Sequence, residues 1–150
     1  MIRKKLAPAI VAGVLAASTL PAFADVSEDI GGLIAFRDEI TRVMDYCFKN
    51  VKQDQTYIQA RDVWLIRNQA DIKAIADALQ KVGGISADEQ KQIDDIINKQ
   101  VETDVTGQAN KEAFCTGLAG EMKGGTTRDL SVLPGAQERM QRVRDYLATP

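Results

Sequence analysis

The sequence predicts an all-α protein: a small antiparallel bundle of about five helices with one disulfide, preceded by a cleaved signal peptide. After residue 25, apolar residues recur at three- and four-residue steps, whereas the two-residue alternation of strands is scarce. Pairs of glycines separate the helical segments. The two cysteines, Cys47 and Cys115, lie on two different segments and can be joined across the bundle.

The first 24 residues have the pattern of a secretory leader. Three basic residues lie within the first five positions, residues 6–20 are mostly apolar, and Ala22-Phe23-Ala24 forms a small-x-small cleavage site. The apolar stretch contains a proline and a glycine and is shorter than the roughly 20 residues that a membrane-spanning helix needs. We therefore expect cleavage after Ala24, no membrane insertion afterwards, and a single helical domain over residues 25–150 in the periplasm or the medium.

The first two helical segments are long. Residues 26–51 carry one apolar stripe that includes Cys47, and Gly31-Gly32 interrupts its pattern, so we expect the regular helix to begin at Leu33. Residues 54–82 form the longest helical pattern. Gly83-Gly84 supplies its stop, because glycine tolerates the left-handed conformation that ends many helices.

Three further segments complete the bundle. Ser86 and Glu89 fit a capping box that starts the third helix. The fourth helix begins near Ala109 and ends at Gly124-Gly125, and Pro134 is expected in the first turn of the last helix. In the third helix the sequence predicts that the apolar residues face the core; they are Ile93, Ile96, Ile97, Val101 and Val105. The polar residues expected in solvent are Asp94, Asp95, Lys99 and Glu102.

Composition excludes several classes of function. The chain has no histidine, which removes His-dependent catalytic triads, His-ligated haem and the usual zinc sites. Removing the leader's three basic residues leaves 16 basic and 21 acidic residues, a net charge of −5. An acidic chain is a poor ligand for nucleic acid and suits a basic protein of the cell envelope as partner.

The cysteines are expected to pair, because thiols oxidise outside the cytosol and only one intramolecular pairing is available. A redox or intermolecular role is the alternative, although the CxxC spacing typical of redox sites is absent. Closing so long a loop is worth about 4 kcal/mol in the chain-entropy treatment.

Two short clusters are candidates for binding a partner. Trp64, Arg67 and Asn68 share one helix face, and tryptophan and arginine are enriched at binding hot spots. The alternative is structural: the tryptophan fills the core, Asn68 bonds to a loop backbone and Arg67 pairs with a carboxylate. Arg128 and Asp129 lie in the longest connection, residues 123–133, where they can bind a partner or cap the adjacent helices.

Motifs for other chemistry are missing. Adjacent helix residues such as Asp94 and Asp95 point about 100° apart, so they do not converge on a metal, and we expect neither a metal site nor a cofactor. The serines after residue 24 lack a nucleophile context, and the glycine pairs lack the pattern of a phosphate loop.

These observations favour an exported periplasmic binding protein without catalysis, such as an inhibitor or immunity-type protein that holds a protein partner. A second hypothesis is a carrier or sensor with a small apolar ligand between its helices. A third is a cell-wall enzyme that uses two carboxylates facing one cleft.

Overall fold

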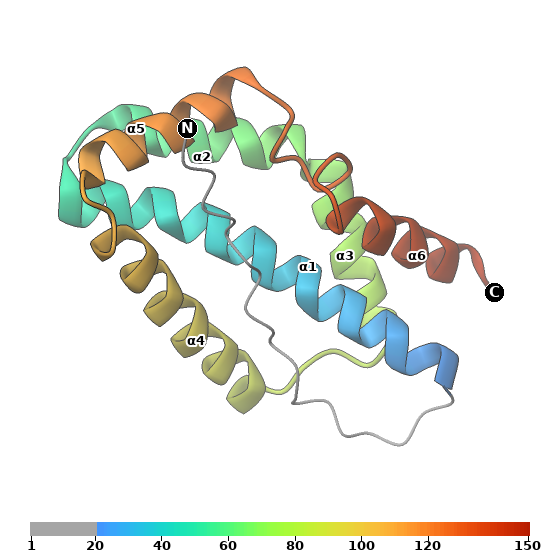
Figure 1. Ribbon diagram of the computed structural model, residues 1–150. Coiled ribbons are helices and arrows are strands. Elements are labelled where there is room, and N and C mark those ends of the chain that lie inside the picture. The colour runs from blue at the N-terminus through green and yellow to red at the C-terminus, as the bar shows by residue number, and fades with distance from the viewer. Residues whose placement is uncertain (1–20) are drawn as a thin grey trace.

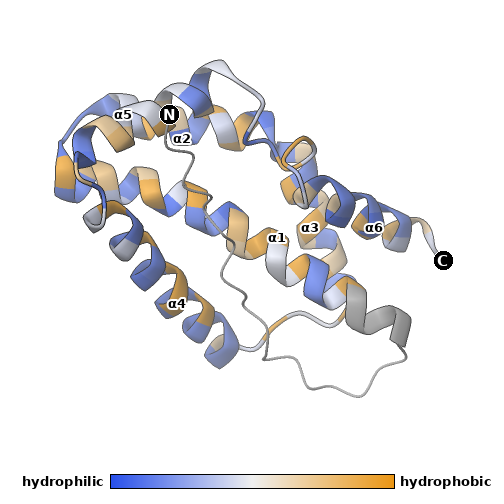
Figure 2. Ribbon diagram, in the orientation of Figure 1, coloured by the Kyte–Doolittle hydropathy of each residue, from blue (hydrophilic) through white to orange (hydrophobic). Residues whose placement is uncertain are grey.

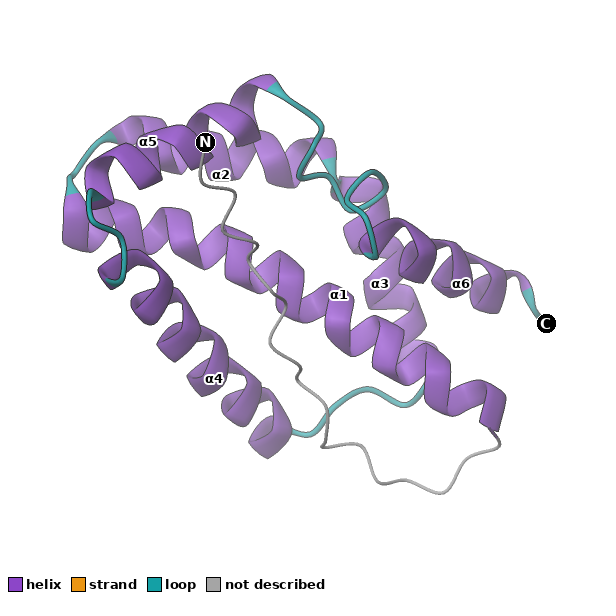
Figure 3. Cartoon of the chain, viewed as in Figure 1, coloured by secondary structure: helices purple, strands orange, loops and turns teal. Residues whose placement is uncertain are grey.

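The computed structural model describes residues 21–150, so most of the predicted signal peptide, residues 1–24, lies outside the described residues. The described chain is all-α, as predicted, and contains no strand (Figure 1, Figure 3). Its elements are α1 Pro21–Tyr46, the π-helix η1 Cys47–Val51, α2 Gln55–Arg67, α3 Gln69–Lys81, α4 Ala87–Thr106, α5 Lys111–Gly124 and α6 Ala136–Ala148.

Helix α1 is the centre of the bundle. It crosses the middle of the molecule and contacts each of the other five helices (Figure 1). Its apolar stripe is buried along the whole length from Val26 to Met44, and the apolar side of α4 faces it (Figure 2). Because burial of such a stripe stabilises a helix more than propensity does, α1 organises the packing of the others.

The expected interruption at Gly31-Gly32 is wrong, because α1 runs through both glycines as one helix. Glycine costs about 1 kcal/mol in a helix interior, and burial of the neighbouring Ile30 and Leu33 outweighs that cost. Gly32 also leaves room for α6, since the Arg139 guanidinium occupies the space that a Cβ at position 32 would take.

The predicted helix over residues 54–82 is two helices, which brings the number in the described chain to six. Asn68 separates α2 from α3 with φ −95° and ψ 10°. Its side chain bonds to the Trp64 carbonyl and to the distant connection between α5 and α6. Asparagine competes for backbone groups in this way, and the local turn follows from it.

Other helix ends follow the sequence more closely. Ser86 and Glu89 form both hydrogen bonds of the capping box at the start of α4. Gly83 and Gly84 have positive φ after α3, as a glycine stop requires. Pro134, expected in the first turn of the last helix, instead precedes Gly135, and α6 begins at Ala136.

Helix α4 lies less deeply than predicted. Ile97, Val101 and Val105 are buried as expected, but Ile96 is 50% exposed. Asp94, expected in water, is half-buried and forms an ion pair with Arg42 of α1. The buried stripe of α4 is therefore narrower than its apolar residues indicate.

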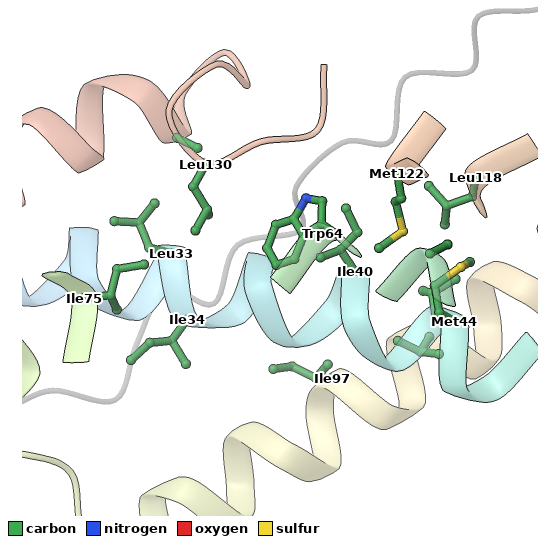
Figure 4. Close-up of a cluster of buried hydrophobic side chains, with 14 of the residues drawn as sticks. Leu33, Ile34, Ile40, Met44, Trp64, Ile75, Ile97, Leu118, Met122 and Leu130 are labelled. Atoms are coloured by element: carbon green, nitrogen blue, oxygen red, sulfur yellow. The ribbon is translucent and has the colours of Figure 1, made fainter. Parts of the chain in front are cut away.

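The core is one cluster to which every helix contributes (Figure 4). Trp64 lies in its middle, between α1 and the connection that carries Leu130 (Figure 4). Cys47 in η1 and Cys115 in α5 are both fully buried and form the predicted disulfide, with their Cα atoms 5.9 Å apart. The bond ties the end of α1 to α5 across 68 residues of sequence.

Replacing both cysteines by alanine should lower the free energy of unfolding by about 4 kcal/mol, because the unfolded chain gains the freedom of that loop. Urea unfolding of Cys47→Ala/Cys115→Ala beside the oxidised parent measures the difference. The parent protein with its disulfide reduced should have a free energy of unfolding similar to that of the double variant. Equal stability of all three would contradict the prediction.

Candidate functional site: a latch and the adjoining groove

The five candidate binding residues converge, although two clusters far apart in sequence supply them. Trp64, Arg67 and Asn68 lie at the α2–α3 junction, and Arg128 and Asp129 lie in the connection between α5 and α6. Side chains of the first group bond to backbone or side-chain atoms of the second. We call this set of five residues the latch.

Trp64 fills the core end of the latch. Its side chain is fully buried, and the ring of Phe36 from α1 contacts it edge-on at 6.5 Å between centroids. The indole Nε1 donates to the Arg128 carbonyl oxygen at 3.0 Å. A buried tryptophan thus has its one polar atom satisfied by the connection that crosses it.

Asp129 is the polar centre of the latch, and its side chain is only 8% exposed. Arg67 donates to it from Nε at 2.8 Å to Oδ2 and from Nη2 at 2.8 Å to Oδ1. Asn68 adds a bond from Nδ2 to Oδ1 at 3.1 Å, and its Oδ1 accepts from the Leu130 amide at 2.9 Å. The hydrogen bond with Asp129 raises the pKa of Arg67.

These are the contacts that the structural interpretation of Trp64, Arg67 and Asn68 predicted. Trp64, Asn68 and Asp129 are buried by them, whereas Arg67 and Arg128 keep part of their surface in solvent. Direct contact with a partner stays a prediction, and within the latch these two arginines are the residues accessible to one.

Arg128 connects the latch to a groove. Its backbone carbonyl accepts from Trp64, while its guanidinium Nε donates to Glu121 of α5 at 2.7 Å. The guanidinium lines two adjoining hollows that share Phe114 and Leu118 as well. Together these hollows form what we call the α1–α4–α5 groove.

The two hollows differ in size and lining. The larger, about 270 Å³, lies along α5 and is bounded by Phe114, Leu118, Glu121 and Arg128. The smaller, about 40 Å³, lies where α1 and α4 approach α5. Its additional lining residues are Phe36, Glu39, Ile40, Val43 and Asp104.

The groove has an apolar floor with an acidic excess at its edges. Three carboxylates, Glu39, Asp104 and Glu121, line it with one cation, Arg128, which is bound to Glu121. Burial raises the pKa of Glu39, the charge of Asp104 raises it further, and Arg128 acts in the opposite direction. The residues that line the two hollows thus offer carboxylates, one arginine and apolar side chains.

Sequence reasoning missed Glu39 and Asp104, although both leave a signal. Each carboxylate lies directly beside a buried apolar residue, Ile40 or Val105, and so stands at the border of the inward stripe of its helix. An acidic residue at such a border can face a neighbouring helix. That α1 and α4 bring these two together is a matter of tertiary packing, which no local pattern contains.

Comparison of the chain with protein-family models, curated proteins and solved structures found no match. Within residues 21–150 no helix combines the length and apolar character needed to cross a membrane. Among the same residues, no three His, Cys, Asp or Glu side chains gather as a metal site.

Removing the Arg67 side chain should lower the free energy of unfolding by about 2 kcal/mol, because it leaves the buried Asp129 carboxylate short of its charged donors. Arg61→Ala is a matched control on the same helix, since both arginines are about a quarter exposed but Asp45, the partner of Arg61, is 35% exposed. The control should lose less than about 1 kcal/mol. Urea unfolding compares the two, and equal losses would contradict a special role for Asp129.

Replacing Glu39 by glutamine should raise the melting temperature at pH 7. The folded carboxyl holds its proton more tightly than the unfolded one, so its ionisation opposes folding above the folded pKa and costs nothing below the unfolded pKa. The gain should therefore shrink as the pH falls from 7 to below about 4. Glu138→Gln, at an exposed position of α6, is the control, and a loss of stability in Glu39→Gln at pH 7 would refute the assignment.

Proposed function

We propose that the mature chain is an exported periplasmic binding protein without catalysis, an inhibitor or immunity-type protein that holds a basic protein partner. The leader pattern supports release into the periplasm with Asp25 as the first residue, and the buried Cys47–Cys115 disulfide suits an oxidising compartment. The single observation that carries the binding role is the placement of charge.

The negative charge of the mature chain is concentrated on one helix. Helix α4 contains six acidic and two basic residues, whereas the remainder of residues 25–150 has 15 acidic and 14 basic residues. Figure 2 shows the hydrophilic side of α4 turned away from α1. Helix α4 is thus an acidic face on a nearly neutral scaffold, and it forms one wall of the α1–α4–α5 groove.

Most acidic residues elsewhere have cationic partners within the fold. Asp29 pairs with Arg142, Asp71 with Arg144 and Asp129 with Arg67. On α4, by contrast, Asp88 and Glu102 are exposed and Asp95 approaches Lys91 only at 3.8 Å. An acidic surface of this kind speeds association with a basic protein and selects against acidic ones.

A carboxylate-dependent enzyme has one observation in its favour, the presence of Glu39 and Asp104 in a single hollow. The hollow measures about 40 Å³, whereas sites for small-molecule ligands typically have volumes of 300 to 1,000 Å³. The larger adjoining hollow, about 270 Å³, does not include Glu39 or Asp104 among its lining residues. The geometry supports docking of a protein side chain better than hydrolysis of a cell-wall polymer.

The acidic face is tested by capture of partners from periplasmic extract on immobilised mature protein. The variant Asp88→Asn/Asp95→Asn/Glu102→Gln removes three charges from α4, and Asp77→Asn/Glu138→Gln/Asp145→Asn removes three from α3 and α6. We expect the parent and the second variant to retain the same basic protein at low salt. The first variant should capture at least about tenfold less of that protein, and high salt should release the partner from the parent.

Two outcomes would contradict this function. Failure of the parent to retain any basic protein at low salt removes the basis for a binding role. Equal capture by both triple variants shows that α4 is not the surface that binds.

A further inference from the structure

We propose that the α1–α4–α5 groove docks a lysine of the partner protein, with the lysine ammonium between Glu39 and Asp104 and an adjacent apolar side chain over Phe114. This inference rests on the proposed function and names the contact that the acidic face guides into place. It follows from three features of the groove: a pair of carboxylates without an ion pair, two hollows of unequal size and an apolar floor on which Phe114 is partly exposed.

The first feature is an exception within the fold. Four buried aspartates occur in the described chain, and each has an arginine partner; they are Asp29, Asp38, Asp71 and Asp129. Glu39 is half-buried, yet neither it nor Asp104 forms an ion pair with any described residue. The carboxylate of Asp104 accepts a side-chain hydrogen bond from Gln100 Nε2 at 2.8 Å, and this neutral donor leaves its charge in place.

Arg128 is the cation available nearby, and another carboxylate already binds it. Its Nε lies 2.7 Å from Glu121 Oε2, and its backbone position is fixed by Trp64. Glu39 thus lies in a partly apolar hollow beside the like charge of Asp104. The charge of Arg128 offsets burial and Asp104 only in part, so the ionised form of Glu39 costs stability in the free protein. A cation from a partner that enters the hollow removes this cost, so the complex regains the stability that the free protein lacks.

The second feature sets the kind of cation. The hollow between Glu39 and Asp104 is about 40 Å³, larger than the 10 to 15 Å³ that one water requires and small for a ligand. Lysine carries a compact ammonium on a slender stem, whereas arginine presents a wide planar fork. The small hollow therefore fits lysine better than arginine.

The third feature sets the neighbour of that lysine. The larger hollow, about 270 Å³, continues from the smaller one across Phe114 and Leu118. Phe114 is half-exposed although it contacts the core, so its ring is available to an incoming apolar side chain. A desolvated apolar contact beside a charge pair is the usual composition of a binding hot spot.

A capped tripeptide, acetyl-Leu-Lys-Leu-amide, is the probe for the groove, with acetyl-Leu-Arg-Leu-amide and acetyl-Leu-Glu-Leu-amide for comparison. Amide chemical shifts of the labelled mature protein report where each peptide binds and with what dissociation constant. We expect the lysine peptide to shift amides around Glu39, Asp104 and Phe114. The arginine peptide should bind more weakly, and the glutamate peptide should leave these amides unmoved.

The variant Glu39→Gln/Asp104→Asn should weaken the lysine peptide at least about tenfold, because the ammonium loses both counter-charges. Asp77→Asn/Glu138→Gln removes the same number of charges from exposed positions on α3 and α6 and should leave the dissociation constant unchanged. Thermal unfolding of each variant verifies that the fold is intact. Phe114→Ala should weaken the leucine contact separately, with the charge pair still present.

The inference is overturned if the lysine peptide shifts no groove amide, if the glutamate peptide binds equally, or if the double variant binds like the parent. Capture of a basic protein from extract distinguishes this failure from failure of the proposed function. Capture that depends on the exposed carboxylates of α4 but not on Glu39 and Asp104 overturns the lysine site alone. Absence of any captured basic protein overturns the proposed function as well.

Discussion

The hydrogen bonds around Asp129 fix the connection between α5 and α6, and much of the remaining structure depends on them. Arg67 and Asn68 donate to the carboxylate from one side. The backbone of the connection donates from the Leu130 amide to Asn68 and accepts at the Arg128 carbonyl from the Trp64 indole. The same asparagine divides α2 from α3. This one polar cluster therefore sets the junction between α2 and α3 and holds the connection over Trp64. It also fixes the backbone of Arg128, whose side chain lines the groove.

The charges of this protein are divided between structure and surface. Three of the four buried aspartates of the described chain are matched by arginines from other elements, such as Asp29 with Arg142 of α6 and Asp71 with Arg144, whereas Asp38 pairs within its own helix. Such pairs are costly to break because an unpaired buried charge is left behind, so they favour one arrangement of the helices. On α4, Asp94 also pairs with Arg42 of α1, but Asp88, Glu102 and Asp104, like Glu39 of α1, form no ion pair with any described residue. They account for the acidic excess, and on our proposals they are the charges available to a partner.

Local pattern predicted much of the fold, and tertiary packing decided the rest. The capping box at Ser86 and the glycine stop at Gly83 are local and were predictable, as was the pairing of the only two cysteines. Gly31-Gly32 predicts an interruption from the low helix propensity of glycine, but α1 continues because Ile30 and Leu33 on either side are buried in the core. The shared face of Trp64 and Asn68 follows from helix periodicity, but their bonds to a connection some 60 residues away follow from packing. The carboxylate pair in the groove depends on the crossing of α1 and α4 and was missed for the same reason.

The measurement that tests this account most directly is native-state hydrogen exchange at the Leu130 amide, which donates to the Asn68 side chain. If the cluster around Asp129 fixes the connection, this amide should be protected as strongly as core helix amides such as that of Met122, although it lies outside any helix. Exchange at the rate of an unprotected loop amide would contradict the account, because the connection would then open independently of the bundle.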